Sequence, residues 1–135
     1  MIDVIGAAFD SFLQAFTPAM DVAWEGTVYE PQAGRPYLSV KLAAYNAAPA
    51  GMGANVAIIE NGTYAVNVNW PAGAGRQPPG AVASALAKYF ARGVTLARSD
   101  GRTITITSSS AAPSTETDGW ITIPVLVRFV SDQPN

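Results

Sequence analysis

The chain contains no cysteine and no histidine. The absence of cysteine excludes a thiol nucleophile, disulfides and thiolate ligands for zinc or an iron–sulfur cluster. The absence of histidine removes the only side chain that changes charge near neutral pH without a perturbed pKa. Catalysis or metal binding would then need a recognisable carboxylate cluster or serine–lysine pair, and we find neither. We therefore predict that the protein is not an enzyme and has no catalytic, cofactor-binding or metal-ligating residue.

Charged residues are also few, at 13% of the chain against about 25% in average soluble domains. The net charge is −2, and Lys and Arg do not cluster as a nucleic-acid-binding surface requires. A free monomer with so little charge has difficulty keeping its surface free of apolar patches. The composition therefore favours a protein partly covered by further copies of itself, and it predicts no specific nucleic-acid binding.

Long hydrophobic runs are missing as well. No run approaches the roughly 18 apolar residues that cross a bilayer, and no charged segment leads into an apolar one as in a secretory signal. We therefore expect a soluble protein, made in the cytoplasm, without a membrane partner. A length of 135 residues, with no internal repeat or linker, predicts a single domain over residues 1–135.

The chain does contain two helical patterns. Over Ile2–Phe16, apolar residues recur every three or four positions and form the wide stripe of a helix packed on a sheet. Thr17-Pro18 ends this helix, because a residue before proline avoids helical geometry. A second helix is predicted over about Ala81–Ala91, with Gly93 as its stop signal.

Elsewhere the apolar period changes to two, which predicts strands. Asn61-Gly62 is typical of a tight hairpin turn, because both residues tolerate positive φ. Pro124 lies inside the last apolar run and predicts an edge position or a bulge. The predicted strands are Val22–Trp24, Tyr37–Tyr45, Val56–Ile59, Tyr64–Trp70, Thr103–Thr107 and Trp120–Phe129.

Three stretches predict loops: Asn46–Gly53, rich in small residues; Pro71–Gly80, rich in Gly and Pro; and Ser108–Asp118, polar and mobile. Together the elements predict an α+β fold. One mostly antiparallel sheet carries two helices packed on a face, in a single domain.

Two stretches invite a chemical interpretation. Pro71–Gly80 precedes a helix like a phosphate loop, but it matches no phosphate-binding pattern and Pro78-Pro79 removes two N–H donors. Three acids lie within Asp21–Glu30, but no second group completes a metal or glycosidase site. We interpret the acids as a solvated strand edge or as partners of Arg35.

A scattered set of Trp, Tyr, Gly and Pro motifs spans nearly the whole chain. In these motifs the chain resembles a phage-related family of small proteins that is similar to the tail terminators of long-tailed bacteriophages. The motifs are Trp24…Tyr29-Glu30-Pro31…Gly34-Arg35-Pro36-Tyr37-Leu38, then Gly62-Thr63-Tyr64, then the Pro71–Gly75 loop before a helix ending in Phe90, and Gly119-Trp120…Ile123-Pro124-Val125.

The resemblance implies a structural virion protein, with no enzymatic activity and no cofactor. It implies a homo-oligomeric ring, commonly a hexamer, which caps the completed tail tube and stops its growth. The partners would be further copies of the chain, the tail tube protein and the connector proteins of the head–neck complex. DNA would pass through the lumen, and the protein would reside in the virion tail after assembly in the bacterial host cytoplasm.

We predict interface residues in two loops and on the second helix. The loops Ala47–Gly53 and Ala72–Pro79 are expected to contact the tube or a neighbouring subunit. Cationic residues near the end of the second helix complement its negative pole and offer subunit contacts. The predicted interface residues are Arg35, Met52, Arg76, Gln77, Lys88 and Arg92.

Two other functions remain open at this point. The first is another virion part of the same region, a head–tail connector or neck protein, which would co-purify with capsids rather than with tubes. The second, of a different class, is a carbohydrate- or ligand-binding module that uses Tyr29, Tyr64 and Trp70 as stacking surfaces. That module would be a strict monomer whose tryptophan fluorescence shifts on ligand binding.

Overall fold

The computed structural model describes residues 2–16, 20–31, 34–49, 58–73, 75 and 77–133. Neither helix in this part of the chain is long and apolar enough to span a membrane. The helices are α1 (Ile2–Gln14) and α2 (Gln77–Tyr89), and the strands are β1 (Asp21–Ala23), β2 (Tyr37–Pro49), β3 (Ile58–Pro71), β4 (Thr95–Ala97), β5 (Thr103–Ala111), β6 (Thr115–Thr117) and β7 (Trp120–Gln133).

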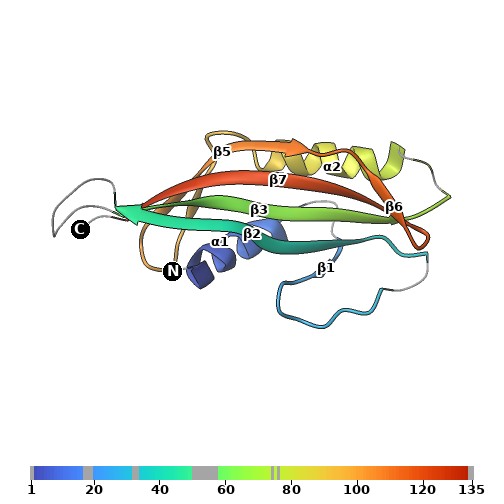
Figure 1. Cartoon of the computed structure of the whole chain (residues 1–135), viewed down its shortest axis with the longest axis horizontal. Helices are drawn as coiled ribbons and strands as arrows, with labels where there is room; N and C mark the ends of the chain where they lie inside the picture. Colours follow the sequence, from blue (N-terminus) through green and yellow to red (C-terminus); the bar gives the residue numbers. More distant parts are fainter. Residues whose placement is uncertain are drawn as a thin grey trace.

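The seven strands form one sheet, in the order β1-β2-β3-β7-β5-β4, with β6 paired to β7. Only β1 and β2 are parallel, and every other pair is antiparallel. The long strands β2, β3 and β7 run along the whole molecule (Figure 1). The predicted α+β fold with a mostly antiparallel sheet is therefore confirmed.

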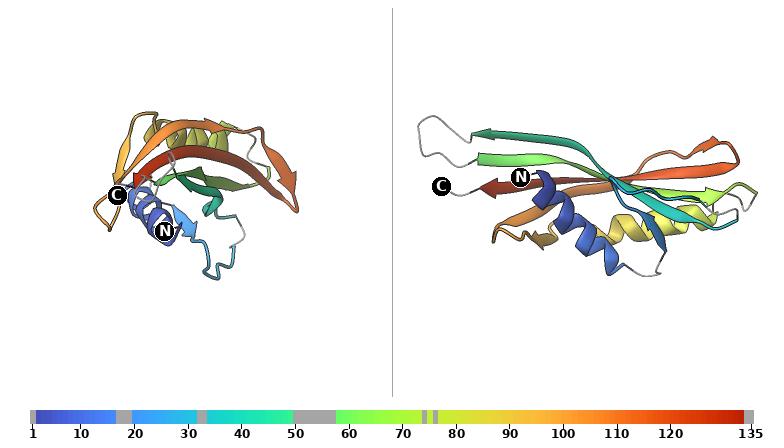
Figure 2. Two further views of the ribbon diagram at one scale, coloured as in Figure 1. Left: turned by 60° about the vertical axis from the view of Figure 1, so that its left-hand side comes forward. Right: turned by 90° about the horizontal axis from the view of Figure 1, so that it is seen from below.

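Both helices pack on the same face of the sheet, as the right-hand view of Figure 2 shows. The ring of Phe9 on α1 stacks on Tyr64 of β3 at 4.6 Å and also contacts Phe90 and Phe129. Burying an aromatic side chain of this kind contributes about 1.5–3 kcal/mol. The apolar stripe predicted from the sequence of α1 is thus the core of the domain.

The hairpin predicted at Asn61-Gly62 is wrong, because β3 continues without interruption from Ile58 to Pro71. Gly62 is paired on both sides, with β2 and with β7. A Cβ at this position would meet the carbonyl oxygen of Ala44 at 2.1 Å and the Cζ atom of Phe129 at 3.1 Å. Glycine at this position therefore lets the backbones of β2 and β3 approach closely beside a bulge in β2. A close approach of two backbones is, besides a turn, a common reason for a glycine within a strand.

Two of the predicted loops are partly strands. β2 continues to Pro49, so only residues 50–53 of the first predicted loop lie beyond it, and these fall outside the described residues. β5 extends to Ala111 and β6 forms at Thr115–Thr117, both within the stretch Ser108–Asp118 predicted as a loop. Serine and alanine do not favour strands strongly, so the pairing with β7 overrides their local preference.

The remaining predicted loop, Pro71–Gly80, is partly helical, because α2 begins at Gln77 rather than at Ala81. Pro78 and Pro79 lie in its first turn, where backbone N–H groups have no partner inside the helix. Two prolines therefore cost this helix no hydrogen bond. The short strand β4, which the sequence analysis did not predict, follows α2 and pairs with β5.

Pro124 lies in a central strand, in an unshifted register with Asn67 of β3, so the predicted edge position or bulge is wrong. Its carbonyl oxygen accepts the N–H of Ala112 at 2.8 Å, between the end of β5 and the start of β6. In an antiparallel strand, the N–H and C=O of one residue face the same neighbour. The donor that proline lacks would therefore point to the place where the neighbouring strand is interrupted.

Candidate functional site

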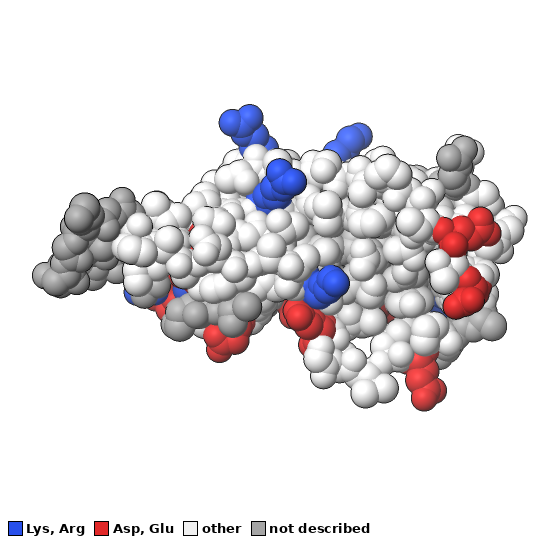
Figure 3. Space-filling view, in the orientation of Figure 1, with Lys and Arg blue, Asp and Glu red and all other residues white. Residues whose placement is uncertain are grey.

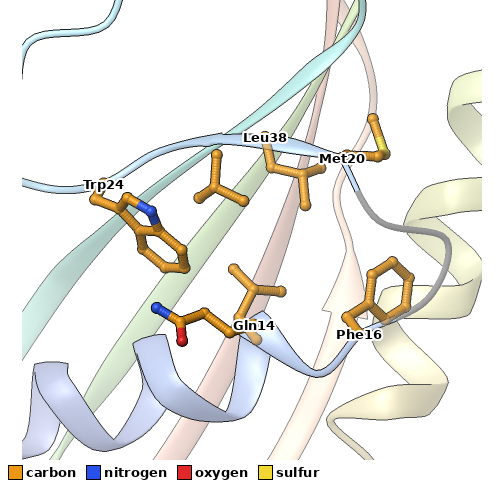
Figure 4. Close-up of a pocket in the computed structure, with 7 residues that line it drawn as sticks. Gln14, Phe16, Met20, Trp24 and Leu38 are labelled. Atoms are coloured by element: carbon orange, nitrogen blue, oxygen red, sulfur yellow. The ribbon is translucent and has the colours of Figure 1, made fainter.

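An apolar groove of about 170 Å³ lies between the end of α1 and the strand β1. Figure 4 shows Phe16 and Gln14 on its α1 side, with Trp24, Met20 and Leu38 facing them. Binding sites for small molecules usually combine apolar walls with several convergent polar groups, and among the described residues that line this groove only Gln14 has a polar amide side chain. The groove therefore offers packing space and no reactive constellation.

A buried ion pair joins Glu60 of β3 to Arg98, which follows β4. The Arg98 Nη1 atom lies 2.9 Å from Oε1 of Glu60, and both side chains are almost fully buried. Arg98 also donates to Oγ of Ser131 at 2.8 Å and pairs with Asp100 at 2.8 Å. Tyr45 of β2 donates its hydroxyl proton to Oε2 of Glu60 at 2.5 Å. The cluster thus links β2, β3, β7 and the turn after β4.

No local sequence pattern predicts this cluster, because Glu60 and Arg98 are 38 positions apart along the chain. Burial by itself would raise the pKa of Glu60, but the hydrogen bonds from Tyr45 and Arg98 outweigh it and hold the pKa below its ordinary value. Burial and the same carboxylate raise the pKa of the Tyr45 hydroxyl to about 12. With the two groups bonded to each other, Glu60 fully buried and Tyr45 partly buried, the cluster is suited to holding strands together rather than to catalysis.

Acidic side chains also gather beside α1 and β2. Asp3, Asp10 and Glu25 line a shallow groove of about 360 Å³ next to Leu42. Burial raises the pKa of Asp10 despite its hydrogen bond from Tyr64, and the charge of Glu25 raises it further. Within the described ranges, no group of three such residues converges in a way that could hold a metal ion.

Four of the six predicted interface residues lie in the described part of the chain, and these four do not form one patch. Arg35 pairs with Asp21 of β1 at 2.9 Å. An ion pair with Arg35 was one of the two interpretations given for the acids of Asp21–Glu30. Gln77 is exposed at the first residue of α2. Met52 and Arg76 lie outside the described residues.

Lys88 and Arg92 lie near the end of α2, on the side of the sheet that carries β5. Both side chains are exposed, Lys88 in the last turn of α2 and Arg92 just after it. Ser109 of β5 donates its hydroxyl proton to the carbonyl oxygen of Ala87 at 2.6 Å, which places the end of α2 beside that strand. These two cations therefore flank the β5 border.

The face of the sheet that the helices leave uncovered carries little charge. Figure 3 shows this face with few charged side chains: most of the visible Lys and Arg lie on or near the upper border, most Asp and Glu lie along the lower border and the right-hand end, and one cation lies beside the acids of the lower border. On β3, Thr63, Ala65, Asn67 and Asn69 alternate with the core residues of the other face, and of these four Ala65 and Asn69 are themselves buried. The molecule is thus polarised from one sheet border to the other.

Comparison with known proteins agrees with this architecture. One solved structure, of a protein without a descriptive name, is 28% identical and superposes with a TM-score of 0.70, covering 98% of this chain and 96% of the other. A second, from the virion of a native gene transfer agent particle, has the same fold, with 19% identity, a TM-score of 0.65 and 96% of each chain covered. No curated protein matches the sequence. The family described as phage tail terminator protein matches residues 4–129, nearly the whole chain. The chain therefore belongs to the phage tail terminator family.

Proposed function

We propose that this protein forms a closed ring that caps the phage tail tube, ends tube growth and offers a surface to the head–neck complex. The observation that carries the proposal is the family match over residues 4–129. Members of this family are structural proteins of phage tails. The capping role is our more specific assignment.

The surface of the molecule supports an assembling subunit. Its uncovered sheet face has few charges, and its two borders carry charges of opposite sign. When a subunit uses one surface to bind a different surface of an identical subunit, the contact closes into a ring if the rotation allows it. The structural match to a chain from a gene transfer agent virion supports a place in a virion for this chain as well.

The experiment is to delete the gene from the phage or prophage that encodes this chain and to measure its tails by electron microscopy. If the protein ends tube growth, tubes made without it exceed the wild-type length and carry no heads. Tubes of normal length without heads would support the connector or neck function instead. Normal, infectious particles would contradict both.

A further inference from the structure

Two borders of the sheet have backbone groups without a strand partner in the described part of the chain. On one border, β1 covers β2 only opposite Tyr37–Ser39, which leaves the outer side of β2 open from Val40 to Pro49. On the other, β4 covers β5 only opposite Thr103–Thr105, and Gly93 and Val94 bond to Ile106. Beyond that point Thr107–Ala111 is open. Such edges are templates for pairing with another strand.

The direction of the strands allows the two open borders to meet. β2 is antiparallel to β3, β3 to β7, and β7 to β5, so β2 and β5 run in opposite directions. If a second copy lies beside the first in the same orientation, as cyclic symmetry requires, its β5 therefore meets β2 as an antiparallel neighbour. That geometry continues the sheet from one copy into the next.

The two open edges are protected against pairing mainly at their ends. Monomeric proteins guard such edges with charged residues, prolines or bulges. On β2 a bulge lies between Leu42 and Ala44, where the Glu25 carboxylate accepts the N–H of Leu42 at 2.9 Å, and Pro49 lies at the other end. On β5 an irregularity in the pairing lies between Ile106 and Ser108. These features lie at the ends of the two segments and leave the residues between them open. Ala44–Pro49 and Thr107–Ala111 contain no charged residue and, apart from Tyr45, consist mostly of small side chains. The hydroxyl of Tyr45 is bonded to the buried Glu60. The exposed Lys41 lies at the bulged end of β2, outside the two segments, so the segments themselves carry no charge that opposes a second strand.

The charges flanking the two borders are complementary. Lys88 and Arg92 lie beside β5, whereas Asp3 and Glu25 lie beside β2, where Lys41 is the one exposed cation of the strand. Within the described part of the chain none of these four side chains is in an ion pair. A head-to-tail contact therefore brings an acidic border to a basic one, whereas a symmetric contact would bring like charges together.

We propose that Ala44–Pro49 of one copy pairs with Thr107–Ala111 of the next, while Asp3 and Glu25 of the first copy face Lys88 and Arg92 of the second. Ser109 lies level with Leu42 across the sheet, through Val127 and Tyr64, so this pairing displaces neighbouring copies along the strands. In a closed ring, such a displacement means that the strands tilt relative to the ring axis. The inference rests on the proposed ring and specifies which surfaces close it.

Cysteine cross-linking tests the pairing directly, because the natural chain has no cysteine. Asn46 and Ser110 pair with Asn61 and Leu126, on the uncovered face of the sheet. In the double variant Asn46→Cys with Ser110→Cys, oxidation on tail tubes should give a ladder of covalent multimers. The matched control Asn46→Cys with Ser84→Cys, which moves one thiol to the exposed side of α2, should give none. A ladder absent from the first pair, or equal in the two, overturns the inference.

Charge reversal gives a second, independent measurement. Lys88→Glu with Arg92→Glu should lower the amount of protein bound to tubes by about ten-fold at low salt, because like charges then face each other. Asp3→Lys with Glu25→Lys should do the same, and all four substitutions together should restore binding. If wild-type protein caps tubes but neither reversal changes binding, this contact is wrong and the capping function stands. If wild-type protein does not bind tubes at all, the proposed function fails and the inference fails with it.

Discussion

Gly62 and Glu60 lie two residues apart on β3, and each occupies a position that few other side chains could fill. Gly62 lets the backbone of β2 pass close to β3 at the bulge. Glu60 is a carboxylate with only 1% of its surface exposed, and it remains charged because Arg98 and Tyr45 bond to it. Both residues lie where β3 pairs with β2 on one side and with β7 on the other. Their substitution should therefore lower the stability of the whole sheet.

Gly62→Ala should lower the free energy of unfolding by about 1–3 kcal/mol or more. This range is the usual cost of adding atoms to a filled site. The added Cβ would lie 2.1 Å from a backbone oxygen, which cannot rotate away as a flexible side chain would. Chemical denaturation of the two proteins measures the difference.

Gly6→Ala is the matched control, because a Cβ at Gly6 in α1 meets nothing within 4 Å. This substitution should raise the stability by about 0.5–1 kcal/mol, since alanine favours a helix more than glycine does. Equal effects at the two glycines would show that close packing at Gly62 is not what requires its glycine.

Glu60→Gln should cost about 3–5 kcal/mol at neutral pH, because it leaves the buried Arg98 guanidinium without its countercharge. The exposed Glu116→Gln on β6 is a suitable control and should stay within about 0.5 kcal/mol of wild type. Urea denaturation at pH 7 measures both. A loss at Glu60 no larger than at Glu116 would contradict the account of a stabilising buried pair.

The same pair should make stability depend on acid. The pKa of Glu60 is held below its ordinary value of 4.5 in the folded protein, so its contribution is complete above that value. As the pH falls further, through the folded pKa, the carboxylate is protonated and the contribution is lost. Denaturation midpoints between pH 7 and pH 3 should therefore fall more steeply for wild type than for Glu60→Gln. Parallel curves would be inconsistent with this assignment.

At the scale of the elements, the continuity of β3 is the largest departure from the sequence-based expectation. Asn61-Gly62 has the composition of a turn, but here its backbone is paired with β2 on one side and β7 on the other. A strand that is paired on both sides exchanges its amide hydrogens slowly, whereas the tip of a hairpin exchanges them fast.

Hydrogen exchange therefore distinguishes the two arrangements. The amides of Asn61, Gly62 and Thr63 that bond to β2 or β7 should be protected to the same degree as those of Val66 and Val68 in the same strand. The exposed turn at Ser99–Gly101 should exchange much faster and provides the internal reference. Fast exchange at all three positions 61–63 would contradict the continuous strand and support the predicted hairpin turn.

The elements that the sequence predicts well are those whose apolar period is clear. The stripe of α1 predicts both the helix and its buried face, and the alternation around Tyr64 and Val125 predicts two central strands. β5 beyond Thr107, β6 and the Glu60–Arg98 pair were missed, because each depends on partners distant in sequence. Glu60 and Arg98 are 38 positions apart, and no local pattern brings them together.

At the scale of the whole molecule, the charge distribution gives the sheet two different borders. Sequence analysis identified Lys88 and Arg92 as interface candidates, and the structure brings them together on the β5 border. It did not identify the acidic border beside β2, because that border combines α1 with Glu25 of the loop after β1. The role of these residues, and of Arg35 and Gln77, in assembly remains a prediction.

The measurement that tests the central claim most directly is tube length in the presence of the purified protein. The cognate tail-tube subunit is polymerised with and without it, and electron microscopy records tube lengths and tube ends. If the protein is a terminator, tubes stop growing and carry a ring at one end, in proportion to the protein added. Tubes that elongate unchanged and carry no ring would contradict the claim.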